Sequence, residues 1–261
     1  MTAKLFSKAL YKLPNLFWPL HNLKEYALIL DTAINSGYHF VTLGELNAGS
    51  TCSDRPFMIL RHDIDTHPEG ALRFAEIEES RGIRATYFFR ISTWHPQLQN
   101  LLNRRGHEVG YHFEELSAYA VKNHLKDKQR VLQQLPQIKA DFISNLSQLR
   151  LSVDFEIKAF AAHGDFAYRT LDLGNRLFMK DEALRKDCGI AYEAYDEALV
   201  TAYQNHISDK PAPQNFYPFS PLNCIARQEH LLFLTHPRWW IANPIGNLRS
   251  DWKGYYRQLR W

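Results

Sequence analysis

Residues 58–68 read Met-Ile-Leu-Arg-His-Asp-Ile-Asp-Thr-His-Pro, so an apolar run ends abruptly in charged and polar side chains. The apolar half is typical of a buried β-strand, and Pro68 is typical of the first turn of a helix. α/β folds place their chemistry at the carboxyl ends of such strands. Asp63 and Asp65 are two residues apart, so their side chains leave a strand on the same face. Two carboxylates this close need a positive partner or a shared proton, and a divalent metal is one such partner.

The same stretch also has a purely structural interpretation. Asp65 or Thr66 could cap the helix that begins near Pro68. His62 points to the opposite strand face from Asp63 and is expected in the core. Arg61 shares the Asp63 face and could neutralise that carboxylate.

Strand and helix signals alternate along most of the chain, whereas residues 166–225 are harder to interpret. We expect strands at residues 38–43, 57–62, 83–91, 107–113, 157–162, 199–203 and 231–235. We expect helices at residues 22–35, 68–81, 96–105 and 248–260, with a helical region at 115–149 that breaks near Pro136. This alternation predicts an α/β fold with mostly parallel strands. We interpret the chain as one domain over residues 1–261, with a helical lead-in (1–50), a catalytic barrel (57–240) and a C-terminal helix (246–261).

The composition contains no large block of charge. The 261 residues are 45% hydrophobic, and the formal net charge is +3, so we expect no nucleic-acid partner. The lysines among the first residues argue against a signal peptide, and no apolar run reaches the ~20 residues of a membrane-spanning helix. We therefore expect a cytoplasmic protein without a transmembrane segment. Residues 5–20 could contact a membrane peripherally or pack against the domain.

Two further features concern the cysteines and the C-terminal tail. The cysteines are widely spaced and form no CxxC pair, which indicates free thiols in a reducing compartment: Cys52, Cys188 and Cys224. The tail is rich in aromatic and basic residues. We expect it to be an amphipathic helix that docks its aromatic side chains on the protein, with stacking on sugars or nucleic acid as the alternative.

Polar side chains also follow three other predicted strands: His112 with Glu114, then His163, then His236. Since the carboxyl ends of parallel strands face the same side, these groups should lie close to Asp63 and Asp65 at one end of the sheet or barrel. We call this end the mouth. Imidazole and carboxylate together suit zinc or a similar ion. A spare carboxylate, Asp63, could take a proton from water, and His236 could protonate a leaving group. His107 lies at the opposite end of its strand, where we expect a structural role.

Four segments resemble the polysaccharide deacetylases of the NodB-homology class, which is similar to carbohydrate esterase family four. They are Leu60–Asp65, Ala85–Phe89, Gly106–His112 and Leu234–Pro237, and they occur in the family's order over about 57–240. The Arg-His-Asp-x-Asp opening resembles members linked to surface-polysaccharide gene clusters. The resemblance implies a distorted (β/α)7 barrel that hydrolyses N-acetyl groups on sugars with a divalent metal.

By position, Asp63 resembles the family's catalytic base, Asp65 its metal-binding aspartate and His236 its catalytic acid. His112 resembles the first histidine of the family's His-x-x-x-His metal motif. The second histidine of that motif is replaced by Leu116, and the Arg-x-Pro-x-Gly motif expected near residues 160–164 lacks its arginine and proline. We therefore expect Asp65, His112 and His163 to be the metal ligands, with Glu114 or Glu115 as substitutes.

The resulting hypothesis is a metal-dependent deacetylase, with zinc as the expected ion, that cleaves an amide bond of an N-acetylated sugar or glycan precursor in surface-polysaccharide biosynthesis. Arg61, Glu114 and Trp239 are expected to contact the substrate. Trp239 and Trp240 could stack on sugar rings or pack in the core. Two alternatives remain open: a catalytically inactive glycan-binding relative, and a metal-free amidohydrolase on the same fold.

Overall fold

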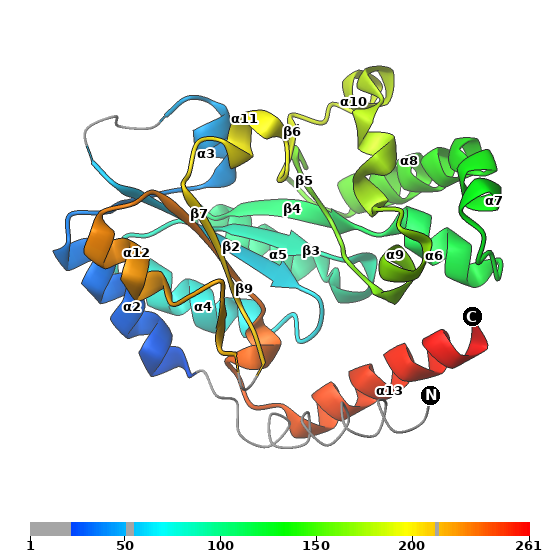
Figure 1. Cartoon of the computed structure of the whole chain (residues 1–261). Helices are drawn as coiled ribbons and strands as arrows, with labels where there is room; N and C mark the ends of the chain where they lie inside the picture. The colour runs from blue at the N-terminus through cyan, green and yellow to red at the C-terminus, as the bar shows by residue number, and fades with distance from the viewer. Residues whose placement is uncertain (1–21, 51–54, 212–213) are drawn as a thin grey trace.

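The structure is a computed structural model that describes residues 22–50, 55–211 and 214–261 (Figure 1). Residues 1–21 of the predicted lead-in (1–50), the segment 5–20 predicted to contact a membrane or pack against the domain, and Cys52 lie outside the described residues. The strands are β1 His39–Val41, β2 Phe57–Ile64, β3 Thr86–Phe89, β4 Glu108–Phe113, β5 Ala159–Ala162, β6 Tyr192–Glu193, β7 Asn205–Asp209, β8 Phe216–Tyr217 and β9 Leu231–Thr235. The helices are α2 Leu23–Asn35, α3 Leu43–Asn47, α4 Gly70–Glu79, α5 Pro96–Arg104, α6 Glu115–Lys122, α7 Lys128–Gln133, α8 Leu135–Ser152, α9 Phe166–Leu171, α10 Glu182–Asp187, α11 Glu197–Val200, α12 Pro221–Arg227 and α13 Pro244–Arg260.

One largely parallel sheet organises the molecule. Its strand order is β6-β5-β4-β3-β2-β9-β7-β8, and β1 pairs with the first half of β2. Every neighbouring pair is parallel except β7 with β8. Strand β2 is central and buried along its whole length. The predicted α/β fold with mostly parallel strands is therefore confirmed.

The sheet curls so that its two ends approach each other. Tyr195 follows β6 and His206 lies in β7, and their ring centroids are 6.2 Å apart. The Arg61 guanidinium of β2 lies over the rings of Phe88 and Tyr195, at 5.2 and 4.7 Å from their centroids, and so occupies the enclosed interior. Within the described residues, no backbone pairing joins β6 to β7. The seven parallel strands β2–β7 and β9 therefore form a distorted (β/α)7 barrel that is open on one side, as predicted.

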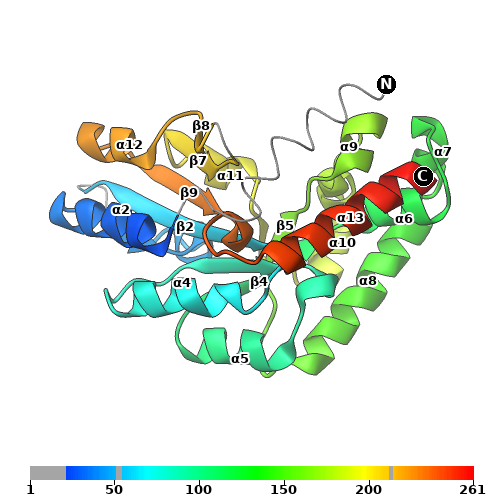
Figure 2. The same ribbon diagram turned by 90° about the horizontal axis from the view of Figure 1, so that it is seen from below.

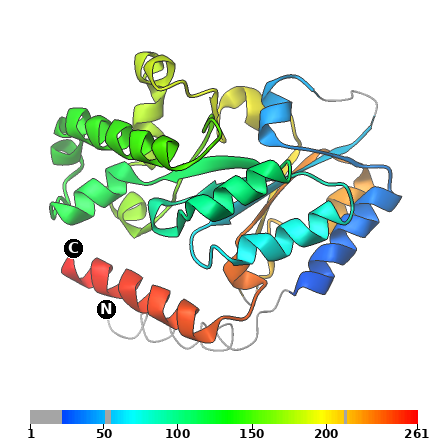
Figure 3. The same ribbon diagram turned by 180° about the vertical axis from the view of Figure 1, so that it is seen from behind.

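The two faces of β2 follow the period of two expected for a strand. Phe57 and Ile59 pack in the barrel interior, whereas Met58 and Leu60 pack outward against α2 and α4. Figures 2 and 3 show α2, α4 and α5 side by side over this outer face of the sheet. This alternation places Arg61 and Asp63 inside the barrel and His62 outside it.

His62 is a core histidine, as predicted. Its Nε2 lies 2.7 Å from Oε1 of Glu78 on α4, and its Nδ1 lies 2.6 Å from the Thr235 hydroxyl. Glu78 also accepts hydrogen bonds from the hydroxyl groups of Tyr26 and Tyr87, at 2.5 and 2.6 Å. The carboxylate is fully buried but surrounded by donors, so this network joins α2, α4 and the sheet.

Three predicted elements differ from the structure. The strand predicted at residues 199–203 is wrong, because Leu199 belongs to helix α11 and the strand β7 begins only at Asn205. The helical region 115–149 breaks near Pro136 as predicted, because α7 ends at Gln133 and Pro136 lies in the first turn of α8. A second break, at residues 123–127, was not predicted and divides the region into three helices. The predicted C-terminal helix is present as α13, but docking through its aromatic side chains is wrong for all but Trp261.

Two other expectations concern the described residues. Cys188 and Cys224 are free, as expected, and both are buried. No helix within the described ranges has the length and apolar character needed to cross a membrane.

Candidate active site

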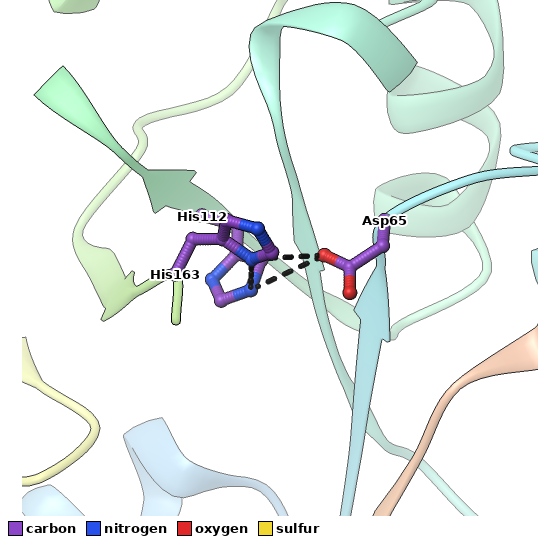
Figure 4. Close-up of side chains that lie close together, drawn as sticks. All are labelled: Asp65, His112 and His163. Atoms are coloured by element: carbon purple, nitrogen blue, oxygen red, sulfur yellow. Dashed lines mark hydrogen bonds and ion pairs between the residues drawn. The ribbon is translucent and has the colours of Figure 1, made fainter. Parts of the chain in front are cut away.

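A carboxylate and two imidazoles converge where β2, β4 and β5 end. Asp65 directly follows β2, His112 lies in β4 and His163 directly follows β5 (Figure 4). Asp65 Oδ1 is 3.2 Å from His163 Nδ1 and 3.5 Å from His112 Nε2, and the two nitrogens are 3.2 Å apart. The structure thus brings the three predicted ligands together, with their ligand atoms within 4.8 Å of one another.

The protonation of His112 suits metal binding. Its Nδ1 lies 2.9 Å from the carbonyl oxygen of Ala161, which can only accept a hydrogen bond. Nδ1 therefore carries the hydrogen, and the lone pair of Nε2 faces Asp65 and His163. Burial lowers the pKa of His112 to about 4, so the ring is neutral at physiological pH.

The surroundings of the Asp65 carboxylate also indicate that this cluster can bind a cation. Its Oδ1 is buried and accepts no hydrogen bond from any described residue, although two imidazole nitrogens lie close to it. Burial alone would raise the pKa of Asp65, but His163 and His112 bring the pKa well below its usual value. An ionised carboxylate with an unsatisfied buried oxygen and two imidazoles is a donor set that zinc prefers.

Asp63 occupies a different environment, although it is only two residues away. Arg61 Nε and Nη2 donate to Asp63 Oδ1 and Oδ2 at 2.8 and 2.9 Å, and Oδ2 lies 3.4 Å from His112 Nε2. Burial would raise the pKa of Asp63, but the charge of Arg61 holds the pKa below its usual value. Asp63 is therefore a buried, ionised carboxylate next to the candidate metal cluster.

The structure corrects the predicted role of Arg61 in substrate binding. The Arg61 side chain has no exposed surface, because Phe88 and Tyr195 cover it and Asp63 occupies its polar edge. A substrate in the mouth would meet Asp63 first. The predicted neutralisation of Asp63 by Arg61 is confirmed.

His236 follows β9 and is held by Asp209, the last residue of β7. Its backbone N–H donates to Asp209 Oδ2 at 2.6 Å, and its Nδ1 lies 2.6 Å from Oδ1. Burial by itself lowers the pKa of His236, but the Asp209 carboxylate raises it to about 9. His236 is therefore protonated at neutral pH and 20% exposed, which suits a proton donor.

Asp209 is a functional candidate that the sequence analysis missed. It also accepts a hydrogen bond from Trp240 Nε1 at 2.8 Å, so it fixes the turn that carries His236. The segment Ile207-Ser208-Asp209 repeats the pattern of a strand ending in a carboxylate, and Lys210-Pro211 follows it. That pattern is too weak to identify Asp209 from the sequence, because Ile207 is the one strongly apolar residue of the strand.

The other predicted site residues have separate surroundings. Glu114 forms an ion pair with Arg90 at 2.5 Å and lines a shallow pocket of about 290 Å³ between α6 and α8. Trp239 is half-buried with the Arg238 guanidinium 4.6 Å above its ring, and Trp240 packs in the core. A substrate contact for Glu114 or Trp239 stays a prediction. Leu116, at the expected ligand position, is fully buried in an apolar core.

Comparisons with known proteins give distant similarities. Neither a protein-family model nor a curated protein matches this chain. Among solved structures, it is similar to a CE4 esterase from Streptococcus mutans, with 14% identity, a TM-score of 0.41, and coverage of 84% of this chain and 87% of the esterase. It is also similar to a CE4-family pseudoenzyme from Bacillus anthracis, with 12% identity, a TM-score of 0.37, and coverage of 79% and 63%. The chain thus spans less than two thirds of the pseudoenzyme.

Proposed function

We propose that this protein is a metal-dependent hydrolase that removes an N-acetyl group from a sugar or glycan precursor. The observation that carries the proposal is the adjacency of three ligand atoms to an ionised carboxylate held by arginine. The resemblance of its motifs to polysaccharide deacetylases supports the sugar substrate. In this proposal the enzyme acts in the cytoplasm, in the biosynthesis of surface polysaccharide.

Asp65, His112 and His163 would hold the divalent ion, for which zinc is the expected metal. When bound, such an ion polarises an amide carbonyl and lowers the pKa of a water molecule. Asp63 is already ionised and is fixed by Arg61, so its carboxylate is ready to accept the proton that water loses. The bidentate contact with Arg61 prevents Asp63 from rotating away from the mouth.

His236 would complete the reaction by donating its proton to the nitrogen of the departing amine. The Asp209 carboxylate keeps His236 protonated, whereas Arg61 keeps Asp63 deprotonated. Two titratable groups whose pKa values are moved apart by their surroundings are suited to act as acid and base in one reaction.

We expect purified protein to contain about one equivalent of a divalent metal, because three protein ligands hold one ion in catalytic zinc sites. Asp65→Ala and His112→Ala should each lose most of this metal, since each removes one ligand atom. Mass spectrometry of protein prepared without a metal-affinity tag measures the content. Asp154→Ala is the matched control, because Asp154 is an exposed carboxylate paired with Arg104. Absence of metal after incubation with excess zinc would contradict the proposed centre.

Release of acetate from N-acetylated sugars tests the reaction itself. Hydrolysis that is lost with a chelator and restored by zinc supports the proposal. Hydrolysis that persists in the chelator would indicate a metal-free amidohydrolase. Sugar binding without metal and without turnover would instead indicate a glycan-binding relative.

Asp209→Asn should move the basic limb of the pH profile of kcat/KM to lower pH. The limb reports loss of the His236 proton, at a pKa of about 9 with Asp209 present. Without the carboxylate the pKa should fall toward about 6.5, which reduces the protonated fraction at pH 8 by roughly 30-fold. Activity below pH 6 should change little. An unchanged basic limb would remove Asp209 and His236 from the proton-donating step.

A further inference from the structure

Helix α13 is attached at its start to the loop that follows Asp65, and at its end to helices α6 and α9. At its start, Asn243 and Asn247 contact the two ring nitrogens of His67 at 2.8 and 2.9 Å, and His67 lies two residues after Asp65. At its end, Trp261 Nε1 donates to the carbonyl oxygen of Ala120 at 3.1 Å. The Trp261 ring also lies 5.5 Å from that of Phe166, three residues after His163. Figure 1 shows α13 below the sheet, and in Figure 2, the view from below, it lies in front of the sheet.

The contact at the start of α13 is close and specific. A Cβ atom at Gly246 would lie 2.3 Å from the His67 ring, so only glycine permits this approach. Asn247 is buried on the inward face, and Asp251 pairs with Arg238 at 2.9 Å. The side of α13 that faces the protein is therefore polar or small.

The outward side of α13 is apolar and aromatic, which reverses the usual arrangement of a surface helix. Its large side chains recur at spacings of three and four residues, so they share one face of the helix. Each is between 41% and 77% exposed: Ile245, Leu248, Trp252, Tyr255, Tyr256 and Leu259. We call these six residues the α13 outer face.

The charges beside the α13 outer face have one sign. Arg249, Lys253 and Arg260 are exposed, and the Arg260 guanidinium lies 5.1 Å from the centre of the Tyr256 ring. Asp251 is the single acidic residue of the helix sequence, and it is already paired on the inward side. The exposed part of α13 therefore combines tryptophan, tyrosine and aliphatic side chains with positive charge.

We propose that the α13 outer face docks this protein on an anionic lipid surface. Helices that lie in a membrane interface carry apolar and aromatic residues on one face and lysine and arginine beside them. Tryptophan and tyrosine suit the headgroup region, since one end of each ring is apolar and the other polar. Each basic side chain gains from the negative potential of anionic headgroups.

The positive charge beside the α13 outer face also favours an anionic lipid surface over a second copy of the chain. Self-association through the same face would bring Arg249, Lys253 and Arg260 of two copies together, and like charges at an interface oppose binding. A lipid surface with negative headgroups supplies the complementary charge. The loops that hold Asp65 and His163 would then lie next to the membrane.

Sedimentation with vesicles tests this proposal on the full chain. We expect binding to vesicles that contain phosphatidylglycerol, and weaker binding to phosphatidylcholine alone. The combined variant Leu248→Ser, Trp252→Ser and Leu259→Ser should bind at least about tenfold more weakly, because it removes apolar contacts with the interface. Arg249→Glu with Lys253→Glu should abolish the preference for the anionic vesicles.

Leu151→Ser is the matched control, because Leu151 is 88% exposed on α8 and outside the α13 outer face. Its binding should equal that of the unchanged chain, and thermal unfolding should be the same for all variants. Residues 1–21 are unchanged in every variant, so undiminished binding in the triple variant would overturn the proposal. Absence of vesicle binding, or a dimer that the triple variant abolishes, would overturn it as well.

Discussion

Asp63→Asn is expected to reduce amide hydrolysis by about 10²- to 10⁴-fold, the range for removing a positioned general base. The metal content should stay near that of the unchanged protein. Asparagine has the shape of aspartate but cannot take a proton from water. Asp63 contacts Arg61 through both oxygens, whereas Asp65 Oδ1 lies next to the imidazole nitrogens of His112 and His163. The two carboxylates should therefore give different variants: Asp63→Asn keeps metal without activity, and Asp65→Ala loses both.

Asp63→Asn also leaves the Arg61 charge without its partner inside the barrel. Breaking a buried ion pair costs about 3–5 kcal/mol, and the remaining amide oxygen should keep the loss near the lower value. Activity must therefore be compared well below the midpoint of thermal unfolding. Acetate release and metal content are measured on the same preparation, with Asp154→Asn as the exposed control. Full activity in folded Asp63→Asn would show that another group accepts the proton.

The central part of the site could be predicted because its signals are local. Asp63, His112 and His163 each lie within or directly after an apolar run of strand length, and parallel strands bring their carboxyl ends together. The alternation of side chains along β2 correctly placed Arg61 with Asp63 and His62 in the core. Both the strand ends and the alternation of side chains can be predicted from residues that are adjacent in the sequence.

Two parts of the site depend on contacts distant in sequence and could not be predicted. The strand β7 contains one strongly apolar residue, Ile207, so Asn205–Asp209 gives almost no strand signal until it pairs with β9. Asp209 was missed for that reason. The burial of Arg61 depends on Tyr195, which the curled sheet brings over its guanidinium.

The C-terminal helix shows a different limit of hydrophobic periodicity. The spacing of Leu248, Trp252 and Leu259 correctly indicates a helix with an apolar face. The same spacing does not state whether that face meets the protein or the solvent. In the structure, the asparagine contacts with His67 orient α13, and the apolar stripe is turned outward.

Glu78→Ala is expected to destabilise the fold by about 3–5 kcal/mol, because it removes the carboxylate around which a buried network is built. Tyr26, Tyr87 and His62 would each lose a partner, and buried donors without partners are costly. For a chain of this size, the midpoint of thermal unfolding should fall by roughly 6–20 °C. Glu76→Ala is the matched control on the same helix, since Glu76 is exposed and, among the described residues, its carboxylate pairs with Arg73 alone. Its midpoint should change little.

The stabilisation by Glu78 should also depend on pH in a defined direction. Burial alone would raise the pKa of Glu78, but His62 beside it holds the pKa below its usual value. A carboxyl group whose pKa is lower in the folded state contributes its full stability above the unfolded pKa of about 4.3, and loses it as the pH falls. The difference in unfolding free energy between the unchanged protein and Glu78→Ala should therefore be largest near neutral pH and narrow below about pH 4. A difference that grows on acidification would mean that Glu78 is protonated in the folded protein and acts only as a neutral hydrogen-bonding group.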